Sequence, residues 1–294
     1  MSAERRFSAT TVKKYHDNVL WFGRVIGDLV VAEIRLEHLI SLKARMSARG
    51  ARAARIAGII FAMKSLLAYA RDILGVSVLD LKSVKAPREA RRDVVYLTEE
   101  ELARFSAAIN LESSWTGEPH VTGYCYRALV ETLLASGMRI SEALSLDRDS
   151  IDFETREAVI IGKGNRQRTV FFTPRALDWI HRYLKVRRDS GRSLFASSSG
   201  RKLTVGAVEF MFRRLSRAAR MEKAVTPHML RHTAATNLLH KGCPIGFIKE
   251  VLGHQRLETT CRFYLGILNK ADTKRAFDSY MIYGDKQPEP RNTS

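Results

Sequence analysis

The chain has 294 residues, 45% of them hydrophobic, which predicts a soluble globular protein with enough apolar residues for two domain cores. Its 49 Lys and Arg residues exceed its 31 Asp and Glu residues and give a formal charge of +18, so we expect a polyanionic partner, chiefly nucleic acid, ahead of a merely basic, solvated surface. The cysteines Cys125, Cys243 and Cys261 are odd in number and widely spaced, which argues against disulfides or a zinc site and for a reducing compartment. We expect all three to be small buried hydrophobic residues.

The N-terminal stretch MSAERRFSATTVKK contains no apolar signal core. The most apolar helix candidate, IAGIIFAM, is bracketed by Arg55 and Lys64, so it is short for a membrane span. We therefore expect neither secretion nor membrane insertion, and we predict a cytoplasmic protein.

Residues 1–81 are predicted to form a helical bundle. In ARIAGIIFAMKSLLAYARDILG the apolar residues recur at three-to-four spacing, whereas Arg55, Lys64 and Arg71 fall on another face. Two earlier segments, TTVKKYHDNVLWFGRVIG and RLEHLISLKARM, complete the bundle. Gly75 is placed to end the long helix.

Residues 82–93 are predicted to be a basic linker between two domains. They include Pro87 and show little apolar periodicity. Their basic side chains either follow a phosphate backbone or are simply solvated. These side chains are Lys82, Lys85, Arg88, Arg91 and Arg92.

A second domain is predicted over residues 94–284. It opens at YLTEEELARF, where Thr98 and Glu101 have the spacing of a helix capping box. Most of it has helical patterns, but FETREAVIIGKGNRQRTVFFT has β-rich runs on both sides of the turn-forming GKGN, as in a hairpin. The predicted fold class is therefore mainly α with a small β-sheet (α+β). The polar tail, residues 285–294, is expected to be disordered.

Two basic residues in this domain are candidates for a functional site. In LLASGMRISEALSL, Gly137 is placed to end one helix and Arg139 to begin the next, where Glu142 can orient its guanidinium. By itself, an arginine–glutamate pair such as Arg139 and Glu142 is more often an ordinary surface ion pair. Lys163 lies in the hairpin turn, and the rest of a nucleotide-binding GxxxxGK motif is missing around it.

A third candidate is the helix start in TPHMLRHTAATNLLHKG. Thr226 suits the N-cap and Pro227 the first helical position, which places His228 and Arg231 three residues apart on one face. The helix N-terminus favours anions, so these two side chains suggest a phosphate site. A metal site at His228 and His232 is disfavoured because no carboxylate occupies the HExxH position. No metal or cofactor site is predicted.

Together these segments resemble the tyrosine recombinase family, also called the phage integrase family. The matching segments, in the family's order and spacing, are ASGMRISEAL, GKGNRQRTV, HMLRHTAAT and VLGHQRLETT followed by a tyrosine. The first 81 residues resemble a core-binding domain only in pattern and length, whereas residues from about 94 onward resemble the catalytic domain. The resemblance implies a site-specific recombinase that cuts and rejoins double-stranded DNA through a 3′-phosphotyrosyl bond, without metal or ATP.

The resemblance also implies a role for each candidate residue. Arg139 and Arg231 would hold the non-bridging oxygens of the scissile phosphate. His228 would accept or relay the proton of the nucleophile, and His254 would hydrogen-bond the phosphate. Lys163 would protonate the departing 5′ oxygen as general acid.

The sequence departs from the family pattern at the nucleophile. The family tyrosine lies nine residues after the LGH histidine, but that position is Phe263, and Tyr264 follows it. A shift of one residue turns a helical side chain by about 100°, unless the helix starts later or contains a π-type bulge. We expect Tyr264 to be the nucleophile, with Tyr280 or Tyr283 as alternatives.

The resemblance further implies a tetramer on two DNA sites, in which the C-terminal helix predicted in LNKADTKRAFDSYMIYG docks on a neighbouring copy. Docking of this helix on its own domain is the alternative. Accessory DNA-bending proteins are compatible with this assignment. Two other functions remain open at this point: a type IB topoisomerase that relaxes DNA alone, and a catalytically silent DNA-binding protein.

Overall fold

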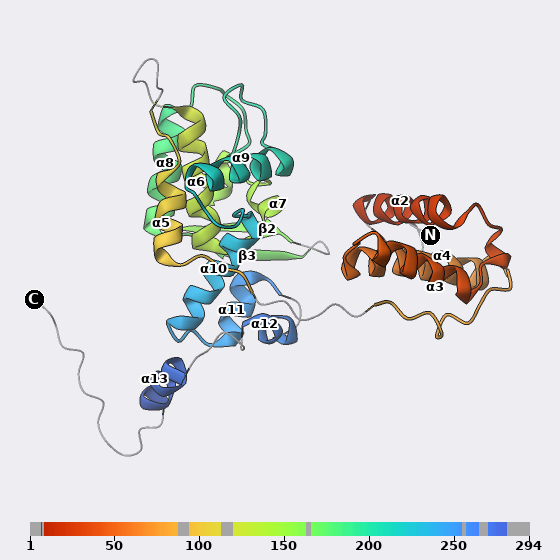
Figure 1. Ribbon diagram of the computed structural model, residues 1–294. Helices are drawn as coiled ribbons and strands as arrows, with labels where there is room; N and C mark the ends of the chain where they lie inside the picture. The colour runs from red at the N-terminus through yellow and green to blue at the C-terminus, as the bar shows by residue number, and fades with distance from the viewer. Residues whose placement is uncertain are drawn as a thin grey trace, which may run out of the picture. The chain divides into compact units, whose positions relative to one another are not determined.

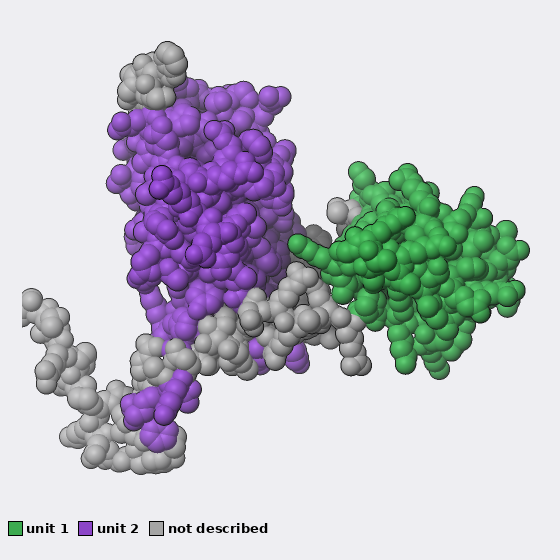
Figure 2. All heavy atoms as spheres, in the orientation of Figure 1, with its two compact units in different colours: residues 1–92 green, residues 93–294 purple. Residues whose placement is uncertain are grey.

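The computed structural model describes residues 7, 9–87, 94–112, 120–162, 166–254, 257–264 and 270–280. It divides the chain into two compact units, residues 1–92 and 93–294 (Figure 2). Both units are built mainly from helices, and the second also contains one small sheet (Figure 1). The predicted fold class, mainly α with a small sheet, is confirmed.

The first unit is a helical bundle of α2 (Ala9–Ile26), α3 (Leu36–Ala48) and α4 (Ala53–Asp72), with a short 3-10 turn at Val31–Glu33. α4 is long and apolar enough to cross a membrane by length and composition. Most of its large apolar residues nevertheless lie in the core of this unit, whereas Phe61 is exposed. The fully buried core side chains are Leu39, Leu42, Ile59, Ile60, Met63 and Leu67.

The end of α4 follows the prediction. Gly75 has a left-handed backbone (φ +65°), which glycine adopts without steric cost. Beyond it, Val76 N donates to Ala70 O at 2.9 Å and closes the helix end.

The first half of the predicted linker packs with this bundle instead of leaving it. Val84 is buried in the bundle core, and Lys64 Nζ donates to its carbonyl at 3.2 Å. Val84 is the one apolar residue between Lys82 and Lys85, and it explains the difference, since it is buried while both lysines reach solvent. The rest of the predicted linker, from Arg88 to residue 93, lies outside the described residues.

The second unit is built around α6 (Val121–Ser136), which packs against α8 (Pro174–Val186) and α10 (Pro227–His240) (Figure 1). Its other helices are α5 (Glu99–Ala107), α7 (Ile140–Ala143), α9 (Val205–Ala218), α11 (Ile245–Leu252), α12 (Leu257–Tyr264) and α13 (Lys270–Tyr280), with a 3-10 turn at Arg148–Ser150. The predicted capping box at the start of α5 is present, because Thr98 Oγ1 accepts from Glu101 N at 3.2 Å and Glu101 Oε2 accepts from Thr98 N at 3.0 Å.

The sheet is antiparallel, with β2 (Glu157–Ile161) between β1 (Ile151–Asp152) and β3 (Gln167–Phe171). The β2–β3 hairpin was predicted, whereas β1 is too short to give an alternating pattern. Ile160 and Val170 face the core, and their neighbours along each strand face outward. The hairpin therefore has one face packed on the domain and one exposed to solvent.

The cysteines differ in part from the prediction. Cys125 is buried, and burial raises the pKa of its thiol to about 11. Cys243 and Cys261 are only half-buried: Cys243 lies in the connection between α10 and α11, and Cys261 lies within α12.

Candidate active site

The first part of the site is the turn between α6 and α7. Gly137 ends α6 with φ +59°, and Arg139 stands at the N-cap of α7. Arg139 N donates to Glu142 Oε2 at 2.8 Å, and Arg139 NH1 donates to Glu142 Oε1 at 2.9 Å. The predicted pairing is therefore present, and it orients a guanidinium that stays about one-third exposed beside a buried carboxylate.

A second arginine, Arg168 of β3, binds the same carboxylate. Its NH1 and NH2 donate to Glu142 Oε1 and Oε2 at 3.1 and 3.0 Å, as a two-pronged fork. Burial alone would raise the pKa of Glu142, but the bonds from Arg168 and Arg139 outweigh it and lower the pKa. Glu142 is thus ionised and accepts four hydrogen bonds.

Sequence reasoning missed Arg168. One signal was available, because Arg168 and Val170 share a face of β3 and Val170 is apolar. A basic residue on an inward strand face needs a buried acidic partner. Its partner lies 26 residues away in sequence, so local spacing does not identify it.

Arg231 enters the site from α10. Thr226 Oγ1 caps this helix by accepting from Met229 N at 3.2 Å, and Pro227 is its first residue, as predicted. Arg231 is 3% exposed. Its NH1 donates to Gly137 O and its NH2 to Leu252 O, both at 2.6 Å. These bonds fix the guanidinium between the turn that precedes Arg139 and the turn that precedes His254.

Two histidines of α10 face each other. The rings of His228 and His232 are 4.8 Å apart and nearly perpendicular. Burial, followed by the charges of Arg231 and Arg139, lowers the pKa of His228. Burial, followed by His228 and Arg231, lowers the pKa of His232 to about 4. Both imidazoles are therefore neutral at pH 7.

His254 follows α11, and its Nδ1 lies 2.9 Å from Thr260 Oγ1 of α12. Burial lowers the pKa of His254 to about 4, with further contributions from Arg231 and Arg139 and then from the other two histidines. Arg231, three residues after His228 on α10, bonds the carbonyls of Gly137 and Leu252, which lie two residues before Arg139 and His254. The structure thus brings together Arg139, His228, Arg231 and His254 from three segments that are far apart in the sequence.

Two predicted residues are not seen in full. Lys163 lies outside the described residues, in the segment of the sequence between Gly162 and Arg166. Tyr264 is the last residue of α12, which is α-helical throughout its described length, and its side chain lies outside the description. Among the described residues, no group of three His, Cys, Asp or Glu side chains is arranged to hold a metal ion.

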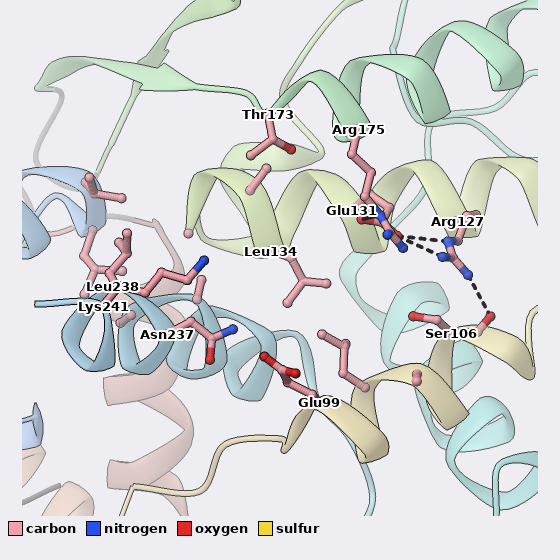
Figure 3. A pocket seen from close by; sticks show the side chains of 18 of the residues that line it. Glu99, Ser106, Arg127, Glu131, Leu134, Thr173, Arg175, Asn237, Leu238 and Lys241 are labelled. Atoms are coloured by element: carbon pink, nitrogen blue, oxygen red, sulfur yellow. Dashed lines mark hydrogen bonds and ion pairs between the residues drawn. The ribbon is translucent and has the colours of Figure 1, made fainter. Parts of the chain in front are cut away.

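A hollow of about 800 Å³ lies between α5, α6, α8, α10 and α11. Gly137 and Leu252, which accept the bonds of Arg231, line it. At one edge, Arg127 and Arg175 both bind Glu131, and Arg127 also donates to Ser106 O (Figure 3). The four gathered candidate residues do not line this hollow.

Comparison with known proteins gives relatives of one kind. A sequence profile described as the Phage integrase family matches residues 96–270, more than half of the chain. The tyrosine recombinase XerC of Alcanivorax borkumensis is 27% identical over 271 residues, which cover 88% of this chain and 84% of the relative. XerC of Chlamydia caviae is 36% identical over 145 residues, so this match spans about half of each protein, 47% of this chain and 46% of the relative.

Solved structures share the fold. XerH recombinase bound to a palindromic difH substrate has a TM-score of 0.73 at 22% identity, covering 95% of this chain and 81% of that one. The Tn1549 transposon integrase in complex with transposon right end DNA has a TM-score of 0.76 at 18% identity, covering 94% and 95%. The profile match over most of the second unit, together with the four motif segments found in it, places the chain in the phage integrase family.

Proposed function

We propose that this protein is a site-specific DNA recombinase that cuts and rejoins strands through a 3′-phosphotyrosyl intermediate. The observation that supports this most is the gathering of Arg139, Arg231, His228 and His254 at one place in the second unit. Two guanidinium groups beside two imidazoles suit a phosphodiester, because they stabilise the negative charge that develops during in-line displacement.

In the proposed reaction the Tyr264 oxygen attacks the scissile phosphorus. A bond from phosphorus to tyrosine forms, and the bond to the 5′ oxygen breaks. His228 accepts or relays the tyrosine proton, while Lys163 gives a proton to the departing 5′ oxygen. The reverse attack, by the 5′ hydroxyl of another strand, rejoins the DNA. The phosphotyrosyl bond conserves the energy of the broken bond, so the proposal requires neither ATP nor a metal.

The protonation of the histidines agrees with these roles. His228 has a lowered pKa, so at neutral pH its imidazole is unprotonated and able to take up a proton. If the Thr260 hydroxyl donates to His254 Nδ1, the proton of that ring is on Nε2, where it can bond a phosphate oxygen.

Tyr264 is chosen over Phe263 because only the tyrosine has a nucleophilic oxygen. Both positions belong to α12 and follow Thr260, the residue that contacts His254, by three and four residues. Positions three and four apart share a helix face, so this register is compatible with either residue and the choice rests on the chemistry of the side chain.

Double-stranded DNA is the proposed substrate, since the chain carries a formal charge of +18 and the XerH and Tn1549 integrase structures named above contain DNA. A tetramer on two DNA sites is proposed as the active form, with the protein acting on DNA in the cytoplasm. The start of α13 contacts α10 of the same chain, where His240 Nδ1 lies 3.3 Å from Asp272 Oδ2. Exchange of α13 between copies would therefore require this contact to open.

Trapping of covalent DNA tests the proposal. On a nicked duplex that releases the cut end, the wild-type protein should form a covalent complex in EDTA. Tyr264→Phe should bind the duplex normally and trap none, because only the nucleophilic oxygen is lost. Phe263→Tyr, made in the Tyr264→Phe background, is the matched control and should not restore trapping. Trapping by the Tyr264→Phe protein would reject Tyr264 as the nucleophile.

A further inference from the structure

Arg168 contacts three parts of this site: the start of α7, the base of the β2–β3 hairpin and the turn before His254. It lies on the inward face of β3, opposite Ile160 of β2, and its side chain is 16% exposed. The fork that it forms on Glu142 joins the hairpin to the start of α7, where Arg139 binds the same carboxylate.

The rest of the Arg168 side chain passes against two glycines. A Cβ built on Gly253 would lie 2.6 Å from Arg168 Nε, closer than atoms can approach. A Cβ built on Gly162 would lie 3.3 Å from Arg168 NH1 and 3.4 Å from Glu142 Oε1. Each glycine directly precedes a candidate catalytic residue, because Lys163 follows Gly162 and His254 follows Gly253.

Gly162 also marks the base of the hairpin tip, since its N donates to Arg166 O at 2.8 Å. The last described residue before Lys163 is thus held by Arg166 and packed on the Arg168–Glu142 fork. Arg168 is fixed in turn by two bonds to a carboxylate that is 4% exposed. The base of the hairpin therefore has a defined place relative to Arg139.

We propose that Arg168 is a positioning residue for strand cleavage, which sets the base of the Lys163 hairpin against the Arg139–Glu142 pair so that the general acid and the phosphate clamp act on the same phosphate. This inference rests on the proposed function. Arg168 itself would not contact DNA, and it would act through its contacts with Gly162 and Glu142.

The effect should be kinetic, because proton transfer depends steeply on placement. Displacement of a catalytic group by about 1 Å can cost roughly 10²-fold in rate. A substituted Arg168 would leave Lys163 in the protein and shift the hairpin that carries it. Cleavage should then be limited by protonation of the departing 5′ oxygen.

Replacement of that oxygen by sulfur isolates this step. In a 5′-bridging phosphorothiolate the phosphorus–sulfur bond breaks, and the sulfur leaves with the electron pair as a thiolate. Thiols have a pKa near 8.5, so this leaving group needs no general acid, unlike an alkoxide. Lys163→Met supplies the reference pattern, slow on the oxygen substrate and restored on the sulfur substrate.

The test compares Arg168→Lys with Arg175→Lys on both nicked substrates. Arg175 also forms a two-pronged fork on a buried carboxylate, with its Nε and NH2 at 3.0 and 2.9 Å from Glu131 Oε2 and Oε1, but it shares this carboxylate with Arg127 instead of Arg139. Arg168→Lys should cleave the oxygen substrate roughly 10- to 100-fold more slowly and the sulfur substrate within about 3-fold of wild type. Arg175→Lys should cleave both at the wild-type rate.

Gly162→Ala gives a second variant, which retains Arg168 and brings a Cβ to 3.3 Å from its NH1, so it should show the same pattern with a smaller slowing. Equal slowing of Arg168→Lys on both substrates, or no slowing, would overturn the inference and leave Arg168 a support of the fold. If instead the wild-type protein cleaves neither substrate, the proposed function itself fails, and the positioning role fails with it.

Discussion

Two regions of the second unit use the same interaction for different ends. Glu142 and Glu131 are both buried carboxylates, and each binds two arginines. The Glu131 group joins α6 to α8 and, through Arg127, to α5. The Glu142 group joins α7 to β3 and presents a partly exposed arginine next to the histidines. A buried carboxylate shared by two arginines is therefore no sign of catalysis by itself, and the residues around it decide its role.

The largest expected difference is in cleavage rate, between variants of two arginines that bond backbone carbonyls, one in each region. Arg231 donates to Gly137 O and Leu252 O, and Arg127 donates to Ser106 O. Loss of one oriented donor to a developing negative charge costs roughly 10²–10³-fold in rate, so we expect this slowing for Arg231→Lys in a covalent trapping assay. Arg127→Lys should cleave at nearly the wild-type rate. Similar rates for the two variants would show that Arg231 serves the fold alone.

An intermediate effect is expected at the two carboxylates. Glu142→Gln and Glu131→Gln each leave two arginines with a neutral partner, so both should lower the free energy of unfolding measured in urea. Only Glu142→Gln should also slow cleavage, by roughly 10- to 100-fold, because the Arg139 guanidinium loses its orientation. Equal cleavage rates after correction for the folded fraction would remove the distinction between the two regions.

The smallest expected effect is a decrease in the free energy of unfolding at acidic pH. Burial, with Arg231 and Arg139, lowers the pKa of His254 to about 4, against about 6.5 for an ordinary histidine. Between about pH 6.5 and about pH 4, His254 is protonated in the unfolded chain but neutral in the folded protein. The free energy of unfolding should therefore decrease as the pH falls through this range.

Urea unfolding at pH 7 and pH 5 measures this decrease. It should be smaller in His254→Gln than in wild type. Arg175→Lys, in the region without a histidine, should keep the wild-type decrease. If His254→Gln also kept the full decrease, the lowered pKa of His254 would not be a source of the pH dependence.

The sequence was sufficient wherever structure depends on neighbours in the chain. The capping box at Thr98, the N-cap at Thr226 and the hairpin around GKGN all rest on contacts within a few residues, and all three are present. The gathering of Arg139 with Arg231 and His254 was not visible in local spacing, and only the family's motif order suggested it.

The features that could not be predicted from the sequence depend on contacts between residues that are distant in the chain. The Arg168 fork on Glu142 spans 26 residues, and no local periodicity encodes such a pairing. Val84 was assigned to a linker because charged neighbours hide a single apolar residue, yet it is buried in the first unit. The half-burial of Cys243 and Cys261 depends on which elements pack over them, and the number and spacing of cysteines do not encode that packing.

Peptide mapping of the covalent complex would identify the nucleophile. Wild-type protein trapped on the nicked duplex would be digested with protease and nuclease, and the modified peptide would be sequenced by mass spectrometry. We expect a nucleotide attached through a 3′ phosphate to Tyr264. A nucleotide on Tyr280 or Tyr283, or the absence of any covalent DNA from a protein that binds the duplex, would contradict it.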